Sequence, residues 1–486
     1  MKKNYIYTVL FSLILSAFTV SCSEPDDEVT TGIFDRLFSP TNVEAVIQKK
    51  TNVKFKWTAV TNATSYTIEL YENQDMTFEG TPKTYEGITD NTYTVEGLLG
   101  ETQYTARIRA LSEEINESKW SAVSFMTEAE NIFNSVKDEN IEAHAVTTDN
   151  KEVEAEGCYV IPGLVDIHFH GCVRHDMCDG TEESIQALAD YEAANGVLAI
   201  CPATMTIPEE ELFQAMNAAR EHKNGKGADL VGINMEGPFV NKEKKGAQKE
   251  EDIKLADVEL FHKLQEAAGG LIKLVDLAPE TEGAMDFINQ VKDEVHVPIA
   301  HTMADYDTAT EAINRGVDHI THLYNAMPPF SHRAPGVIGA ARDSECYVEL
   351  ICDGVHIHPS CVRATFEMFT DKRIVLISDS MMATGMEDGQ YELGGQPVTV
   401  VGNVATLTEG GAIAGSATNL MDCMRTVVKE MHIPFESAVR CATLNPAKSI
   451  GIDDKYGSFE EGKYANAVVL DKDLNIVSII QKGQVK

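Results

Sequence analysis

The feature that most constrains this chain is a repeating pattern that begins near residue 158: a short apolar run, a polar loop and a stretch with helical periodicity. Amphipathic stretches such as residues 182–196 and 307–316 separate the runs. The eight expected strands are residues 158–168, 197–203, 229–236, 271–277, 297–301, 318–322, 347–353 and 374–379. Eight such units in a row predict an α/β fold, a (β/α)8 barrel rather than an open sheet. The near-continuous apolar strands suit a parallel sheet that is buried on both faces.

Polar side chains stand at the ends of several of these strands, where a barrel of this kind carries its chemistry. One histidine on an apolar strand is more often a satisfied core residue than a ligand, but six polar residues at one rim are hard to assign to packing. They are His168 and His170, two apart and so on one face of their strand, and Glu236, His301, His322 and Asp379. Imidazole and carboxylate groups together predict a metal centre with one or two divalent ions, for which Zn, Fe, Mn and Co are all suitable.

Residues 38–128 have a different character. Short runs rich in Val, Thr, Tyr and Ile, such as VKFKW (53–57) and QYTARIRAL (103–111), are separated by turn-forming residues. Evenly spaced short strands of this kind predict an all-β sandwich. An aromatic carbohydrate-binding face is the alternative, but the aromatic residues lie on the inward register, which favours a spacer or adhesion module.

The first 22 residues have the layout of a secretory signal. Two lysines precede an apolar stretch over residues 6–20, which is short for a membrane span. Ser21 and Cys22 follow, and this ending resembles a bacterial lipoprotein signal in which Cys22 is lipidated. Residues 23–37 would be an acidic linker. We therefore expect an exported cell-envelope lipoprotein, periplasmic or on the outer-membrane surface, that meets the membrane only through its N-terminal lipid. The alternative is an ordinary cleaved signal with an incidental cysteine.

The formal net charge of −36 excludes some partners. A surface this negative repels phosphate backbones, so nucleic acid is not expected as a partner. An anionic small molecule would need a local cluster of Arg, Lys or His to reverse that field.

Several segments, read in order, carry a family resemblance. PGLVDIHFHG, MEGPFVNKEKKGA, IAHT, THLYNAMPPFSHRAPG, DGVHIHP, ISDS and GAIAGSATNL resemble the amidohydrolase superfamily over residues 155–480, roughly. Within it, EGPF and HLYNAMPP resemble the N-acetylglucosamine-6-phosphate deacetylase family. Residues 38–128 resemble a fibronectin type III domain, in which Trp57, Tyr66, Leu98 and Tyr104 would be core residues.

The resemblance implies a function: removal of the acetyl group from a small amino-sugar substrate, N-acetylglucosamine 6-phosphate, by a metal-dependent hydrolase that usually dimerises. Glu236, His301 and His322 would hold the catalytic metal, and His168 and His170 a second one bridged by Glu236. Asp379 would be the general acid/base. The alternative is that it is a metal ligand only, and the two roles can coexist. The residues that would contact the substrate are Ala247, Gln248, Asn325, Ala326, Arg333, His356, Ile413, Ala414 and Gly415.

Among these, Arg333 and His356 would bind the phosphate, with help from the backbone N–H groups of Asn325 and Ala326. The alternative for Arg333 is a surface ion pair in a loop. Gln248 stands where the family usually has His, so recognition of the substrate could differ there.

The resemblance also implies a division of the second domain, residues 129–486. The barrel would span about 158–450, and a small β-sandwich subdomain would come from 129–157, 394–408 and 457–486. Two other functions remain open: hydrolysis of another extracytoplasmic N-acyl sugar or amide in the same site, and a non-catalytic surface protein on the same scaffold.

Overall fold

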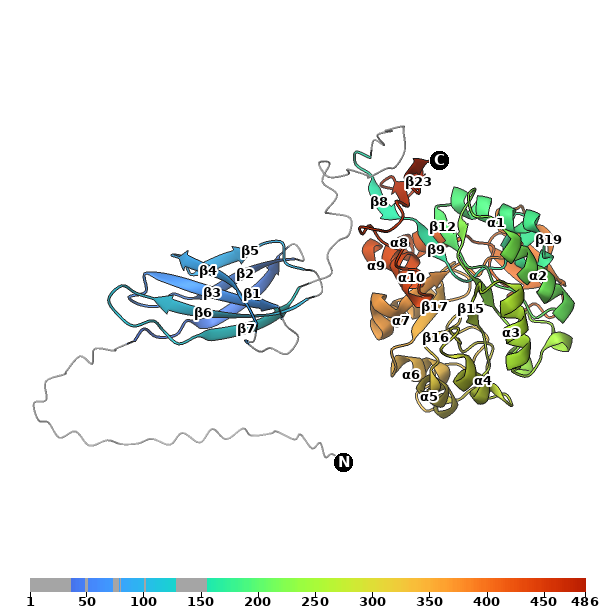
Figure 1. Ribbon diagram of the computed structural model, residues 1–486, viewed down its shortest axis with the longest axis horizontal. Coiled ribbons are helices and arrows are strands. Elements are labelled where there is room, and N and C mark those ends of the chain that lie inside the picture. The colour runs from blue at the N-terminus through green and yellow to red at the C-terminus, as the bar shows by residue number, and fades with distance from the viewer. Residues whose placement is uncertain (1–35, 49–50, 73–77, 79, 100–101, 128–154) are drawn as a thin grey trace, which may run out of the picture. The chain divides into compact units, whose positions relative to one another are not determined.

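The computed structural model describes residues 36–48, 51–72, 78, 80–99, 102–127 and 155–486. The chain divides into two compact units, residues 1–130 and 131–486 (Figure 1). Among the described helices, none has both the length and the apolar character that crossing a bilayer requires. The predicted signal, Cys22 and most of the predicted linker lie outside the described residues.

The first unit is a sandwich of two antiparallel sheets, with strand orders β1-β2-β5 and β4-β3-β6-β7. Alternation of apolar and polar residues produces it: along β2 the side chains of Val53, Phe55 and Trp57 are buried and those between them are not. The strands are β1 (Thr41–Gln48), β2 (Asn52–Thr58), β3 (Ser65–Glu72), β4 (Lys83–Ile88), β5 (Thr92–Val95), β6 (Gln103–Leu111) and β7 (Ser121–Met126).

The predicted core of this sandwich is confirmed, because Trp57, Tyr66, Leu98 and Tyr104 are each at most 6% exposed. Trp57 and Tyr66 pack edge to face with their ring centroids 5.0 Å apart.

Arginine and aromatic side chains form a ladder on the four-stranded sheet of this unit. The guanidinium carbons of Arg107 and Arg109 lie 4.6 and 4.5 Å from the centroid of Trp120. Arg107 also forms an ion pair with Glu69, with Nη2 2.6 Å from Oε2. These contacts join β3, β6 and the segment that leads into β7.

The second unit contains the predicted parallel barrel, which confirms the α/β fold class. Parallel pairs link its strands in the orders β13-β12-β9, β14-β15 and β16-β17-β18. Isolated parallel bridges complete the circuit, including Leu277 to Ile299 and Ile299 to Ile320. The strands are β9 (Leu164–Asp166), β12 (Val197–Ile200), β13 (Asp229–Leu230), β14 (Ile233–Met235), β15 (Ile272–Val275), β16 (His319–Ile320), β17 (Tyr347–Ile351) and β18 (Ile374–Ile377). The expected strand 229–236 is divided into β13 and β14, and the expected strand 297–301 is present only as isolated bridges at Ile299.

The barrel closes between its first and last strands just beyond their assigned ends. The N–H of Asp379 donates to the carbonyl oxygen of His168 at 2.9 Å, and the N–H of His170 donates to that of Ser380 at 2.8 Å. Closure therefore brings two predicted site segments into direct backbone contact.

Helices surround the barrel strands, as Figure 1 shows in green, yellow and orange. The first is typical: Thr181 caps α1 by accepting a hydrogen bond from the N–H of Ser184. The helices are α1 (Glu182–Ala194), α2 (Glu209–Glu221), α3 (Val258–Ala267), α4 (Ala284–Val291), α5 (Tyr306–Arg315), α6 (Gly336–Arg342), α7 (Pro359–Arg373), α8 (Leu420–Lys429), α9 (Phe435–Ala442) and α10 (Leu444–Ser449), with short 3-10 turns at Met177–Asp179, Lys242–Lys244 and Glu250–Asp252.

The segment expected to be the first barrel strand, residues 158–168, is two strands. β8 (Tyr159–Pro162) pairs antiparallel with β22 (Ala467–Leu470), whereas β9 pairs parallel with β12. Gly163 lies between them, and a Cβ at this position would lie 2.6 Å from a methyl carbon of Leu198. The apolar pattern does not mark the boundary, because both sheets bury this segment.

The small β-structure contains two sheets, and most of the predicted contribution from residues 129–157 lies outside the described residues. Residues 394–408 belong to a separate sheet, β19 (Gly389–Leu393), β20 (Gln396–Val401) and β21 (Val404–Leu407). The C-terminal segment forms the other sheet, in the order β24-β23-β22-β8, with β23 at Ile476–Gln481 and β24 at Gln484–Val485. A short hairpin of β10 (Gly171–Cys172) and β11 (His175–Asp176) follows β9.

Candidate metal centre

The six residues predicted at the barrel rim lie together, and all of them are buried. His168 and His170 follow β9, Glu236 follows β14, and Asp379 follows β18. His301 and His322 follow the bridged segment at Ile299 and strand β16. Parallel strands carry these side chains to one end of the barrel, so that residues more than 200 positions apart in sequence become neighbours.

Three of these residues have a left-handed backbone. The φ angles are 41° at His301, 26° at His322 and 49° at Asp379. Non-glycine residues rarely adopt this region, and such strain is typical of functional sites where surrounding contacts hold it. At Asp379 the backbone is held on both sides, since its N–H donates to His168 and its carbonyl accepts from the N–H of Ser416 at 2.7 Å.

One group of candidate ligands consists of Glu236, His301 and His322. Oε1 of Glu236 lies 2.8 Å from Nε2 of His301 and 3.2 Å from Nε2 of His322. The two histidine nitrogens are 3.2 Å apart. All three atoms therefore lie within 3.2 Å of one another, close enough to be donors to a single cation.

A second group consists of His168, His170 and the other oxygen of Glu236. Oε2 of Glu236 lies 3.2 Å from Nε2 of His170 and 3.8 Å from Nε2 of His168. Asp379 borders this group, with Oδ1 3.3 Å from Nε2 of His170. Glu236 therefore presents one oxygen to each group, as a bridging ligand does.

The donor atoms fit divalent cations. Nε2 of His168 and Oε2 of Glu236 are buried and have no hydrogen-bond partner among the described residues, although both are directed into the cluster. Burial opposes ionisation of Glu236, but the surrounding imidazoles of His168, His170, His301 and His322 outweigh it and hold the pKa of this carboxyl well below its ordinary value. A buried anion that faces four imidazoles suits Zn, Fe, Mn or Co.

Other buried residues hold these histidines in place, and inspection of the strand ends alone missed them. Nδ1 of His168 lies 2.8 Å from Oε2 of Glu349, and Nε2 of His319 lies 3.1 Å from Oε1 of the same carboxylate. Nδ1 of His301 lies 2.8 Å from the carbonyl oxygen of Lys244. The available signal was a charged residue within an otherwise apolar strand, such as Glu349 in YVELICD.

Two further acidic residues lie at the ends of barrel strands: Asp166 is the last residue of β9, and Asp276 directly follows β15. Ser378 donates to Asp166 at 2.6 Å, and Thr321 donates to Asp276 at 2.9 Å. Burial raises the pKa of Asp166 to about 7, against the hydrogen bond from Ser378, and burial also raises the pKa of Asp276 well above its ordinary value. Both are fully buried at the same strand ends as the cluster and hydrogen-bond to neighbouring strand-end hydroxyls rather than to the side chains of the candidate ligands.

Part of the predicted substrate-binding set lies close to the cluster. The turn at Ile413–Gly415 packs against the end of β18, since a Cβ on Gly415 would lie 3.1 Å from the carbonyl oxygen of Asp379. The Asn325 N–H donates to the carbonyl of His322 at 2.9 Å, so it is already engaged and differs from the free phosphate donor that we expected. The carbonyl of Ala326 accepts from the N–H of Thr302.

His356 is oriented by a neighbouring acid. Its Nδ1 lies 2.8 Å from Oδ2 of Asp353, whose backbone carbonyl accepts from the side chain of Asn403 at 3.2 Å. Burial opposes protonation of His356, but the hydrogen bond and the charge of Asp353 raise its pKa. A protonated His356 would suit an anionic substrate group.

Three other predicted contacts have different surroundings. Gln248 is buried, and its Oε1 accepts from the N–H of Thr206 at 2.6 Å. The carbonyl of neighbouring Ala247, which is also buried, accepts from the side chain of Gln396. Arg333 lies in an exposed loop, with Nη1 2.7 Å from Nε2 of His332.

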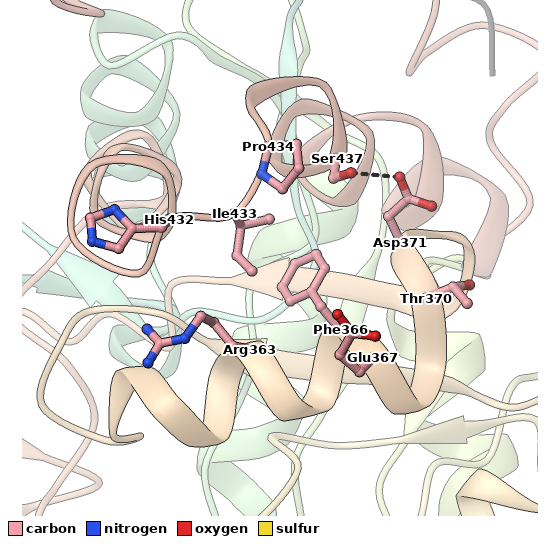
Figure 2. Close-up of a pocket in the computed structure, with 9 residues that line it drawn as sticks. All are labelled: Arg363, Phe366, Glu367, Thr370, Asp371, His432, Ile433, Pro434 and Ser437. Atoms are coloured by element: carbon pink, nitrogen blue, oxygen red, sulfur yellow. Dashed lines mark hydrogen bonds between the residues drawn. The ribbon is translucent and has the colours of Figure 1, made fainter. Parts of the chain in front are cut away.

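A separate surface hollow of about 360 Å3 lies between α7 and the segment that leads into α9 (Figure 2). Ser437 donates to Asp371 at its rim, at 2.7 Å. None of its lining residues is a predicted site residue. They are Arg363, Phe366, Glu367, Thr370, Asp371, His432, Ile433, Pro434 and Ser437.

Comparisons with known proteins agree with this geometry. Residues 159–486 match the amidohydrolase family and residues 38–127 the fibronectin type III domain. The chain is 39% identical to N-acetylglucosamine-6-phosphate deacetylase of Bacillus subtilis (strain 168), over 69% of this chain and 87% of that protein. It is 33% identical to N-acetylgalactosamine-6-phosphate deacetylase of Escherichia coli O157:H7, over 68% and 88%.

A solved structure is similar as well. It is the D267A mutant of N-acetyl-D-glucosamine-6-phosphate deacetylase from Mycobacterium smegmatis, in complex with N-acetyl-D-glucosamine-6-phosphate. The TM-score is 0.65 with 27% identity, over 80% of this chain and 95% of that one. The chain therefore belongs to the amidohydrolase family and, within it, to the group that contains the N-acetylglucosamine-6-phosphate deacetylases.

Proposed function

We propose that this protein removes the acetyl group from N-acetylglucosamine 6-phosphate, giving glucosamine 6-phosphate and acetate. The observation that carries the proposal is the pair of His/Glu groups that share Glu236, with Asp379 beside them, in a chain 39% identical to a deacetylase of that substrate. Amide hydrolysis needs an activated amide, an activated water and a group that carries a proton, and the residues of this site can provide for each of them.

Divalent cations held by His168, His170, Glu236, His301 and His322 would supply Lewis-acid activation of the amide and of the attacking water. Asp379 would accept a proton from the water as the new C–O bond forms. It would then deliver that proton to the sugar nitrogen as the C–N bond breaks, so one carboxylate acts first as base and then as acid.

The substrate would be held by the other predicted residues. His356 and Arg333 would bind the phosphate, and Ala247, Gln248, Asn325, Ala326 and the turn at 413–415 would contact the sugar. For Gln248, whose side-chain oxygen already accepts from Thr206, the contact would come from the remainder of the group.

A substrate panel tests the proposal. Purified protein supplied with Zn2+, Fe2+, Mn2+ or Co2+ in parallel should release acetate from N-acetylglucosamine 6-phosphate, and much less from unphosphorylated N-acetylglucosamine. N-acetylgalactosamine 6-phosphate belongs in the panel, because one relative at 33% identity acts on that sugar. Acetate release only from unphosphorylated sugars, or hydrolysis only of other amides, would mean that one of those compounds is the substrate in place of N-acetylglucosamine 6-phosphate. No acetate from any of them, with any of the four metals, would favour a non-catalytic scaffold.

We also propose export, lipidation at Cys22 and a homodimer. The layout of residues 1–22 supports export and lipidation, and the family resemblance supports the dimer. Labelling of cells with a fatty-acid analogue should mark the native chain and not Cys22→Ser. Light scattering of the purified protein should give twice the chain mass.

A further inference from the structure

We infer that the buried pair Glu349 and His319 orients His168 and so sets cation affinity at the group formed by His168, His170 and Glu236. Both are positioning residues, because they act through His168 and contact no reacting atom. The inference deepens the proposed function and rests on the cation binding that it includes.

The first step is the orientation of the His168 ring. Its Nε2 is buried, has no hydrogen-bond partner among the described residues and lies 3.8 Å from Oε2 of Glu236. Its Nδ1 lies 2.8 Å from Oε2 of Glu349. A ring nitrogen at this distance from a carboxylate carries the proton, which leaves the Nε2 lone pair directed at the cation.

The second step is that Glu349 is itself held from three sides. Besides His168, its Oε2 accepts from the backbone N–H of His322 at 3.2 Å, and its Oε1 lies 3.1 Å from Nε2 of His319. Glu349 and His319 are both 0% exposed. A carboxylate that receives three hydrogen bonds in a dry interior has one orientation, so the position of the His168 ring is fixed in turn.

The third step is that, among the described residues, no other candidate ligand has a carboxylate at its Nδ1, although the backbone N–H of His322 also donates to Glu349. Nδ1 of His170 and of His322 have no hydrogen-bond partner in the part of the chain that the structure describes, and Nδ1 of His301 meets a backbone carbonyl. A carboxylate makes an imidazole a stronger donor than a neutral carbonyl does, and loss of such a partner typically lowers metal affinity 10–100-fold, roughly. Loss of the Glu349 carboxylate should therefore weaken cation binding at the group that contains His168.

The experiment is a Zn2+ titration of the metal-free full-length protein by calorimetry, which needs no substrate. The wild type should bind two ions. Glu349→Gln should lower the affinity for one ion by about 10–100-fold, while the affinity for the other stays within about threefold. Glu192→Gln is the matched control, because Glu192 is another fully buried glutamate, and it should leave both affinities unchanged.

A double variant assigns the effect to His168. In a His168→Ala background, Glu349→Gln should cause no further loss of affinity, because the ring that Glu349 orients is absent. Three results would each overturn the inference. Glu349→Gln could cause the same loss of affinity in the His168→Ala background as in the wild type, or it could by itself lower both affinities equally. The third such result is a wild type that binds a single ion.

His319 provides a test if Glu349→Gln does not fold, as judged by circular dichroism. His319→Leu removes a donor to Glu349 and should weaken the same ion, whereas His319→Gln keeps a donor and should recover most of the affinity. Equal affinities in these two variants would contradict the inference. Absence of acetate release together with the expected shifts would count against the proposed function and leave this inference intact.

Discussion

At the scale of single residues, the two carboxylates that border the candidate centre have different surroundings. Glu236 is enclosed by four histidines and gives one oxygen to each group. Asp379 meets the cluster through one close contact, 3.3 Å from His170, and its side chain keeps 10% exposure. Glu236 thus has the position of a bridge, and Asp379 can reach both the cluster and a substrate.

This difference predicts the outcome of Asp379→Asn. The variant keeps the shape of the side chain and should keep its cation content, but kcat for N-acetylglucosamine 6-phosphate should fall about 10²–10⁴-fold, the usual contribution of a general acid or base. Steady-state kinetics with parallel elemental analysis of the protein measures both quantities. Full activity in this variant would contradict the proton transfer assigned to Asp379.

Arg333 allows a prediction about specificity. If its guanidinium binds the phosphate, Arg333→Ala should lower kcat/KM for the phosphorylated sugar about 10–100-fold, which corresponds to the ~1.5–3 kcal/mol of a charge-assisted hydrogen bond. The same variant should leave unphosphorylated N-acetylglucosamine nearly unaffected. Equal losses of kcat/KM for the two sugars would mean that Arg333 supports the conformation of its loop and does not bind the phosphate.

At the scale of elements, the strand pattern was sufficient to predict the barrel and the rim residues, because parallel strands place their C-terminal ends together. It was insufficient where two sheets bury one apolar run, as in residues 158–168, which β8 and β9 divide between them. It also missed Glu349 and His319, whose partners lie on other strands of the barrel. The environments of Arg333 and Gln248 depend on loop conformation, which periodicity does not encode.

The arginine and aromatic ladder of the first unit gives a prediction at this scale. Arg107→Ala removes an ion pair with Glu69 and a contact with Trp120, and should lower the free energy of unfolding by about 1–2 kcal/mol. Both tryptophans of the chain, Trp57 and Trp120, lie in this unit, so the change in tryptophan fluorescence in urea follows its unfolding.

The matched control for that variant is Lys119→Ala, at an exposed neighbouring position, which should leave the unfolding midpoint in place. If Arg107→Ala also left the midpoint in place, the ladder would be a surface contact without a stabilising role.

At the scale of the whole molecule, the tryptophan residues and the candidate cation ligands lie in different units. All candidate cation ligands lie in residues 131–486, whereas both tryptophans lie in residues 1–130. Bound cations stabilise the unit that holds them by mass action, by about 2.7 kcal/mol at a hundredfold excess over the dissociation constant. Any effect of the cations on stability should therefore be confined to one of the two units.

Removal of the cations tests this division. Treatment with a chelator should lower the thermal unfolding temperature followed by far-ultraviolet circular dichroism, to which the helices of the second unit contribute most, and added Zn2+ should restore it. The transition followed by tryptophan fluorescence should stay within about 1 °C, since no cation leaves that unit and ~1 kcal/mol would already shift such a domain by several degrees. A fluorescence transition that moves with the dichroism would show that the units unfold together. A dichroism transition that does not move would contradict cation binding in the barrel.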